Sequence, residues 1–131
     1  MSIQSSDILN AAKLCLEMNS EAGFRSCTSR AYYSMYHESL DALQCVPNYT
    51  SNHHSNLIGY MTTPAETKTE PYDSRVVKVL GYNLKQMRDA RNEADYRISE
   101  LTVSRSMAEA SLESAELYFS KWNDLRAAKA S

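Results

Sequence analysis

Residues that interrupt helices are scarce in this chain. It contains three glycines and three prolines among 131 residues, and the prolines all lie between positions 47 and 71. Glycine costs conformational entropy and proline lacks a backbone donor, so both disfavour helix interiors. The stretches on either side of the proline region are rich in alanine, leucine, methionine, glutamate and basic residues, which are good helix formers. The sequence therefore predicts an all-α fold.

Apolar residues recur at helical spacing in four long stretches. Ser5 and Asp7 at the start of the first stretch and Ser104 before the fourth are residue types that cap helix N-termini well. We expect residues 126–131 to be frayed. The predicted helices run from about residue 5 to 19–23, from about 24 to 44, from about 73 to 98, and from 104 towards the C-terminus. Their predicted apolar faces include Ala31, Met35, Leu40, Val76, Leu80, Ile98, Ala108, Leu112 and Trp122.

Residues 48–72 have a different composition, rich in asparagine, threonine and serine. Their apolar residues gather near His53–Met61, so we expect a long connection that holds one short helix there. Four amphipathic helices cannot each bury an apolar stripe alone. We therefore expect a single domain over residues 1–131, folded as a four- to five-helix up-and-down bundle.

Charge and motifs exclude several classes of function. The 14 Lys and Arg residues against 16 Asp and Glu give a formal net charge of -2, so an RNA contact would need a local basic patch. No apolar run approaches the roughly 20 residues that span a bilayer, and the N-terminus lacks a signal pattern, so we expect a cytoplasmic protein without a membrane partner. No Gly-rich phosphate loop or zinc motif occurs, and the doublet His53–His54 lacks a third ligand, so we expect no cofactor and no metal.

Four polar residues follow one strip of the second predicted helix. Their spacing of four, three and four residues confines them to about 60° of the helix surface, and Tyr33 borders the strip. A guanidinium stabilises phosphate charge and an imidazole transfers protons, which is the minimum set for RNA cleavage without a metal. The alternative interpretation is a solvated helix face. The four residues are Arg30, Ser34, His37 and Asp41.

The third predicted helix adds a second polar group, in the run MRDARNEADYR. Arg88, Arg91 and Asn92 supply donors, and Asp95 follows Arg91 at the i,i+4 spacing of an ion pair. Arg91 flanks the apolar face, so it needs a partner if it is partly buried. The Arg91–Asp95 pair therefore either holds two helices together or belongs to a functional site.

Two of these runs resemble a known family. SRAYYSMYHESLDAL, residues 29–43, resembles the second-helix signature of small stand-alone prokaryotic HEPN domains. ARNEADYRISELTVSRSMAEASLESAELYF, residues 90–119, is similar to the R-x-x-A-D-Y element of that group and the helix that follows, and HSNLIGY is like the short helix between them. The resemblance spans about residues 14–122. It implies a helical bundle that forms homodimers, with many members acting as metal-independent ribonucleases in toxin–antitoxin, CRISPR-linked or antiviral systems, often beside a nucleotidyltransferase partner.

The nuclease members of this family carry an R-x4-6-H motif, usually R-N-x-x-x-H, near the end of a long helix. Arg91 and Asn92 match its start, and Tyr96 stands at the position of its histidine. Arg30 and His37 satisfy the loose form of the spacing, although they lie in the second predicted helix. A two-fold dimer could bring Arg30, His37, Arg91 and Asp95 of both chains to one cleft, because isologous packing presents each group twice.

Two hypotheses follow, and whether the chain is an enzyme stays open between them. The first is a HEPN-family ribonuclease or toxin-like protein acting on RNA, with His37 as proton shuttle and Arg30 and Arg91 as phosphate binders. In this hypothesis Asp95 and Tyr96 orient those groups. The second is a catalytically inactive HEPN module that binds a nucleotide or a protein partner such as a nucleotidyltransferase. The further binding residues expected are Tyr33, Ser34, Arg88 and Asn92.

Overall fold

The computed structural model describes residues 3–130, which fold into six α-helices without a strand. This confirms the prediction of an all-α helical bundle. No helix in the described part of the chain is long and apolar enough to cross a membrane. The helices are α1 (Ser5–Glu17), α2 (Glu21–Ala42), α3 (His53–Met61), α4 (Pro64–Thr67), α5 (Ser74–Tyr96) and α6 (Arg105–Ala130).

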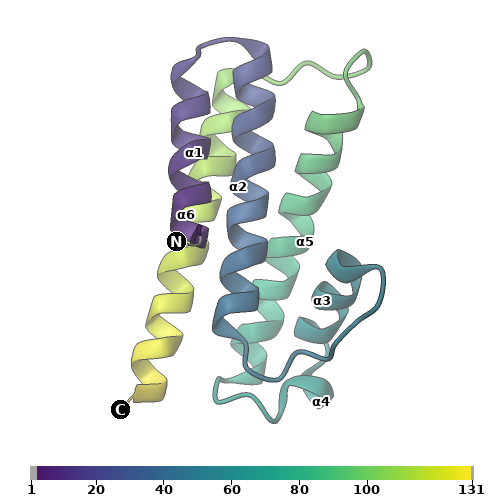
Figure 1. The fold of residues 1–131 in the computed structure, drawn as a ribbon, viewed down its shortest axis with the longest axis vertical. Helices are drawn as coiled ribbons and strands as arrows, with labels where there is room; N and C mark the ends of the chain where they lie inside the picture. Colours follow the sequence, from purple (N-terminus) through teal and green to yellow (C-terminus); the bar gives the residue numbers. More distant parts are fainter. Residues whose placement is uncertain (1–2, 131) are drawn as a thin grey trace.

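The four long helices run alternately up and down, and the two short helices lie at one end of the bundle (Figure 1). Helix α2 is central, because it packs against α1, α5 and α6. Helices α5 and α6 make few contacts with each other, whereas α3 packs on α5. The lower half of α5 is therefore flanked by α2 and α3, and this arrangement positions the site described below.

Capping side chains fix where the long helices begin. Ser20, Asp73 and Ser104 each accept a hydrogen bond from a backbone N–H in the first turn, at 3.2, 2.9 and 3.2 Å. The first helix is capped one residue earlier than the sequence suggests. Its cap is Gln4, whose backbone N–H donates to the Asp7 carboxylate at 2.9 Å.

Inward-facing residues of the long helices form one core. The apolar spacing predicts most of this core, because a helix that packs on its neighbours buries one stripe. Leu40 is instead exposed on the outer side of α2, and Val76 is only partly buried. The predicted residues that are buried are Ala31, Met35, Leu80, Ala108, Leu112 and Trp122.

Arg25 explains why the third long helix is shorter than predicted. Its buried guanidinium donates to the carbonyl oxygens of Ala94 at 2.9 Å, Ile98 at 3.3 Å and Leu101, and it pairs with Glu21 at 2.9 Å. These bonds satisfy carbonyls at the C-terminus of α5 and fold the following loop against α2. The chain leaves the helix before Ile98, which is 71% exposed and does not join the core.

The last turns of α6 remain helical, whereas the sequence analysis expected residues 126–131 to fray. Arg126 bonds to the carboxylate of Glu38 at 2.8 Å, and Lys129 lies 5.9 Å from the ring centroid of Tyr72. Both contacts tie the end of α6 to other parts of the bundle. Residue 131 lies outside the described residues.

One buried carboxylate holds the connection between α2 and α5 in place. Glu70 accepts hydrogen bonds from the backbone N–H groups of Gln44 and Cys45, both at 2.8 Å, and from the Tyr60 hydroxyl at 2.6 Å. Three donors compensate the cost of burying this carboxylate. The end of α2, helix α3 and the segment after α4 are thereby joined at one point.

Two backbone features bring α3 against its neighbours. Asn52 precedes α3 at a φ of 53°, in the left-handed region that asparagine tolerates better than most residues. Gly81 on α5 has no side chain where α3 ends, and a Cβ there would lie 2.9 Å from the Met61 Cβ. Glycine at this position permits the close approach of α3 to α5. These features set the position of the histidines at the start of α3.

Candidate functional site

Six side chains from three helices converge between α2, α3 and α5. Helix α2 contributes Tyr32, Tyr33 and Tyr36, which contact one another on the side of the helix that faces α3 and α5. Helix α3 contributes one imidazole and helix α5 two guanidiniums, one helical turn apart on the same face. We name this group the aromatic–arginine cluster; it consists of Tyr32, Tyr33, Tyr36, His54, Arg88 and Arg91.

His54 lies at the centre of this cluster. Its ring stacks on Tyr36 with a centroid distance of 4.0 Å, and it meets the Tyr33 ring edge-on at 5.9 Å. Its Nδ1 is 2.5 Å from the hydroxyl oxygen of the fully buried Tyr32. The imidazole is half-buried, so its Nε2 is the nitrogen left for a ligand.

Burial and neighbouring cations both act on the protonation of His54. Burial lowers the pKa of His54 below its ordinary value, and the charges of Arg88 and Arg91 lower it further, with smaller contributions from His37 and His53. The imidazole is therefore neutral at pH 7. Burial also raises the pKa of Tyr32 well above its ordinary range, although both arginines oppose this shift, so the phenol stays protonated.

Arg91 is surrounded by partners. Its Nε lies 3.1 Å from the carboxylate of Asp95, it donates to the Tyr33 hydroxyl, and its Nη1 donates to Asn92 at 3.0 Å. The Tyr96 hydroxyl is 3.5 Å from Nη2. On an ideal helix Arg91 and Tyr96 point about 140° apart. They meet here because Tyr96 is the last residue of α5 and both side chains are long.

The Arg91–Asp95 pair connects two helices. The Asp95 carboxylate also accepts a hydrogen bond from Ser29 Oγ on α2 at 3.0 Å. The side chain of Arg91 is only 14% exposed, so its charge needs these partners. The structure thus contains the contacts expected from the structural interpretation of this pair, and it also sets the guanidinium against the tyrosine rings.

Arg88 links the cluster to a groove between α3 and α5. The groove has a volume of about 340 Å³ and is lined on the α5 side by Tyr82, Lys85, Arg88 and Asp89. Ser55, the residue after His54, lines it from α3. Two cations, Lys85 and Arg88, and one carboxylate, Asp89, line this groove, and the charge of Arg88 also acts on the imidazole of His54.

The polar strip predicted on α2 is only partly present. Arg30, His37 and Asp41 are exposed, but Ser34 is fully buried and its hydroxyl donates to the carbonyl oxygen of Ala31 at 2.7 Å. The expectation that all four groups are available on one face is wrong at Ser34, because α2 packs against α1, α5 and α6 and this side chain is buried among them. Ser34 therefore offers no group to a ligand.

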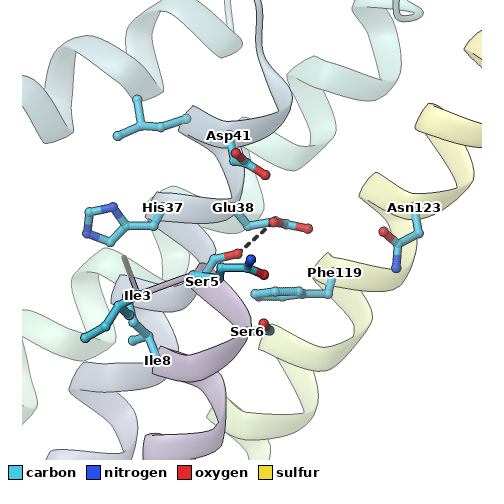
Figure 2. Close-up of a pocket in the computed structure, with 11 residues that line it drawn as sticks. Ile3, Ser5, Ser6, Ile8, His37, Glu38, Asp41, Phe119 and Asn123 are labelled. Atoms are coloured by element: carbon cyan, nitrogen blue, oxygen red, sulfur yellow. Dashed lines mark hydrogen bonds between the residues drawn. The ribbon is translucent and has the colours of Figure 1, made fainter. Parts of the chain in front are cut away.

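His37 and Asp41 line a different groove, between the start of α1, α2 and α6 (Figure 2). This α1–α2–α6 groove has a volume of about 970 Å³. Its floor holds Glu38, only 5% exposed, which accepts hydrogen bonds from Ser5 Oγ at 2.9 Å and from Arg126 at 2.8 Å. The guanidinium of Arg126 is thus occupied by carboxylates, and the groove is acidic.

His54 is the member of the cluster that the sequence analysis missed. The doublet His53–His54 lacks metal-binding spacing, and no group of three or more potential metal ligands occurs among residues 3–130. The periodicity of α3 did turn His54 to the same side as the buried Leu57 and Met61. That pattern separates His54 from the exposed His53, but the tyrosines that face it become visible only in the packed structure.

Comparisons of the chain with protein-family models, with curated proteins and with solved structures find no match. The residues and their geometry are therefore the basis for a functional assignment.

Proposed function

We propose that this chain is a HEPN-type protein that acts on RNA and cleaves it without a metal ion at the aromatic–arginine cluster. One observation carries the proposal. His54 is a neutral imidazole at pH 7 that feels the charges of two guanidiniums, and one of these, Arg88, lines the groove between α3 and α5. A proton acceptor beside fixed cations is the combination that transfer of a phosphodiester to a ribose oxygen requires.

His54 serves as the general base in this proposal. When Nδ1–H donates to the Tyr32 oxygen, Nε2 is an acceptor. It takes the proton of a ribose 2′-hydroxyl while the 2′-oxygen bonds to the adjacent phosphorus. The bond from phosphorus to the 5′-oxygen breaks, and the 5′-oxygen takes a proton from water. The products are a 2′,3′-cyclic phosphate and a 5′-hydroxyl end, and the imidazolium returns its proton to solvent.

The two arginines stabilise the phosphate charge that grows in this step. Arg88 and Lys85 bind the backbone where they line the groove, and Arg91 faces the reacting phosphate from the tyrosine side. Asp95 and Tyr96 act as positioning residues, because both contact Arg91. This retains the sequence-based roles of Arg91, Asp95 and Tyr96 and transfers the proton step from His37 to His54.

A second candidate function is a catalytically inactive HEPN module that binds a partner, such as a nucleotidyltransferase, or a nucleotide. The bonds of Arg91 favour it: Asp95, Asn92, Tyr33 and Tyr96 all engage this guanidinium. An arginine with so many partners stabilises the junction of α2 and α5 even if no phosphate ever binds. The resemblance to HEPN proteins extends both proposals to a homodimer and to a toxin–antitoxin or defence role.

Cleavage of single-stranded RNA in the presence of EDTA tests the two proposals. We expect wild-type protein to release fragments that end in 2′,3′-cyclic phosphate, and His54→Gln to lower the rate by about 100-fold or more, since general-base catalysis contributes about 10²–10⁴-fold. Glutamine keeps a hydrogen-bonding group for Tyr32. Equal melting temperatures for the two proteins would show that the loss is chemical.

The variant His37→Ala decides between the two histidines. A large loss in His37→Ala with normal cleavage in His54→Gln would return the proton step to His37 and overturn the assignment made here. Phe119→Ala in the α1–α2–α6 groove is the control and keeps wild-type activity. If wild-type protein cleaves no RNA, the inactive module is the correct reading.

A further inference from the structure

A second pocket adjoins the aromatic–arginine cluster on the other flank of α3. It has a volume of about 300 Å³ and is formed by α2, the segment after α2 and α3. In Figure 1 this segment passes from the end of α2 around α3. Helix α3 lines the pocket with His53 and Leu57, whereas Ser55 and Gly59 line the groove on the Arg88 side. The two hollows thus flank the start of α3.

The lining of this pocket is aromatic with a few polar groups. Tyr36 and Tyr49 present two rings, Pro47 adds an apolar surface, and Asn48 and His53 supply hydrogen-bonding groups. Burial raises the pKa of Tyr49, and the Glu66 charge adds to this shift, so the phenol is neutral. An asparagine amide carries both donors and an acceptor, which matches the edge of a nucleobase.

Tyr36 is shared between the pocket and the cluster. One face of its ring stacks on His54 at 4.0 Å, and the same residue lines the pocket. A ligand in the pocket therefore contacts the residue whose ring stacks on the imidazole. This spacing suits a nucleotide whose base occupies the pocket while its ribose and phosphate extend towards His54.

We propose that this pocket receives one unpaired base of a single-stranded RNA whose phosphate lies at the aromatic–arginine cluster. The proposal rests on the proposed function and adds a base-binding pocket to it. A base in a duplex is stacked and paired, so it does not enter a side pocket, whereas a single strand can splay a base onto aromatic side chains. Tyr49 provides stacking, and Asn48 provides discrimination among bases.

Fluorescence anisotropy tests this pocket. The probes are labelled single-stranded RNA octamers, one for each base, and a duplex of mixed sequence. The titrations are done in EDTA at low temperature, where cleavage is slow. We expect Tyr49→Ala to weaken single-strand binding about tenfold, the effect of removing one stacked base. Duplex binding stays unchanged. Tyr49→Phe keeps the ring and restores wild-type affinity, which a lost hydrogen bond or misfolding would not do.

The variant Asn48→Ala changes the order of affinity among the four octamers without changing duplex binding. Phe119→Ala removes a half-buried aromatic ring from the α1–α2–α6 groove and leaves all affinities unchanged. Wild-type single-strand affinity in Tyr49→Ala would overturn the inference.

The two proposals fail in different ways. If Tyr49→Ala weakens RNA binding but wild-type protein cleaves no RNA, the base pocket is supported and the proposed catalysis is wrong. If cleavage depends on His54 but wild type and Tyr49→Ala bind RNA equally well, the proposed catalysis is supported and the base pocket is wrong. Absence of any RNA binding by wild-type protein would overturn both.

Discussion

Two regions of this bundle each contain an exposed or half-exposed imidazole, and their surroundings differ in charge. In the aromatic–arginine cluster, His54 stands beside two guanidiniums and three tyrosine rings. In the α1–α2–α6 groove, His37 lies among the lining residues with Glu38 and Asp41, and both of these carboxylates are paired with Arg126. The groove is larger, at about 970 Å³ against 340 Å³ for the groove at Arg88.

The volume of a groove is therefore a poor guide to the proposed phosphate site. A phosphodiester needs cations that are free to bind it, because moving an anion next to carboxylates is unfavourable. The α1–α2–α6 groove offers apolar surface and negative charge. The cluster offers a neutral base and Arg88, which forms no ion pair among residues 3–130, whereas Arg91 is paired with Asp95.

The largest effect is expected at Arg88. Replacement of this arginine in Arg88→Gln should lower kcat/KM for RNA cleavage by about 100-fold, since fixed charges that stabilise a transition state contribute about 10²–10³-fold each. Arg126→Gln, the matched change in the α1–α2–α6 groove, should leave kcat/KM unchanged. Steady-state kinetics on one labelled RNA measures both. Equal losses of kcat/KM in Arg88→Gln and Arg126→Gln would contradict the assignment of the phosphate site to the cluster.

The next effect concerns stability and is expected at Glu38. The variant Glu38→Ala leaves the Ser5 hydroxyl and the Arg126 guanidinium without their shared acceptor. We expect a loss of about 2 kcal/mol in the free energy of unfolding, measured by urea denaturation, with normal RNA cleavage. Glu116→Ala is the control: its contact with Lys13 is 3.9 Å long and exposed, so the change costs about 0.5 kcal/mol or less. A cleavage defect in Glu38→Ala without loss of stability would make the groove part of the site.

The smallest effect is the pH dependence of stability. Because the pKa of His54 is lowered by folding, the unfolded chain binds its proton first as the pH falls. Stability contributed by the neutral imidazole is therefore complete above the ordinary histidine range and decreases as the pH drops through about 6.5 towards the lower folded value. Urea denaturation between pH 7.5 and 5 should show a shallower decrease for His54→Gln than for wild type. A decrease of the same steepness in His54→Gln and wild type would contradict the neutral imidazole.

The sequence predicted the helices well because their signals are local. The prolines delimit the connection, the limits of the short helix follow from the apolar group at Leu57–Met61, and Ser104 is the cap that was expected. The predicted end of the third helix was wrong at Ile98, because Arg25, distant in sequence, binds the carbonyl oxygens there. Only a contact between distant segments determines that end.

The candidate site was less predictable for the same reason. Spacing on one helix put Ser34 beside Arg30 and His37, but the packing of neighbouring helices decides which of these residues is exposed. His54 owes its properties to residues on two other helices, since its partners are Tyr32 and Tyr36 on α2 and Arg88 on α5. No pattern within α3 carries that information.

The Glu70 carboxylate has a consequence for the segment between α2 and α3. This carboxylate binds the amides that follow α2 and also the Tyr60 phenol, so it holds together the two ends of the segment formed by residues 46–59. The two ends stay together without help from the peptide between them. A protease cut or a short insertion within that segment, near Ser51, would leave α3 anchored from its far end. The segment that bears Tyr49 can therefore vary in length and composition while His54 keeps its position opposite the tyrosines.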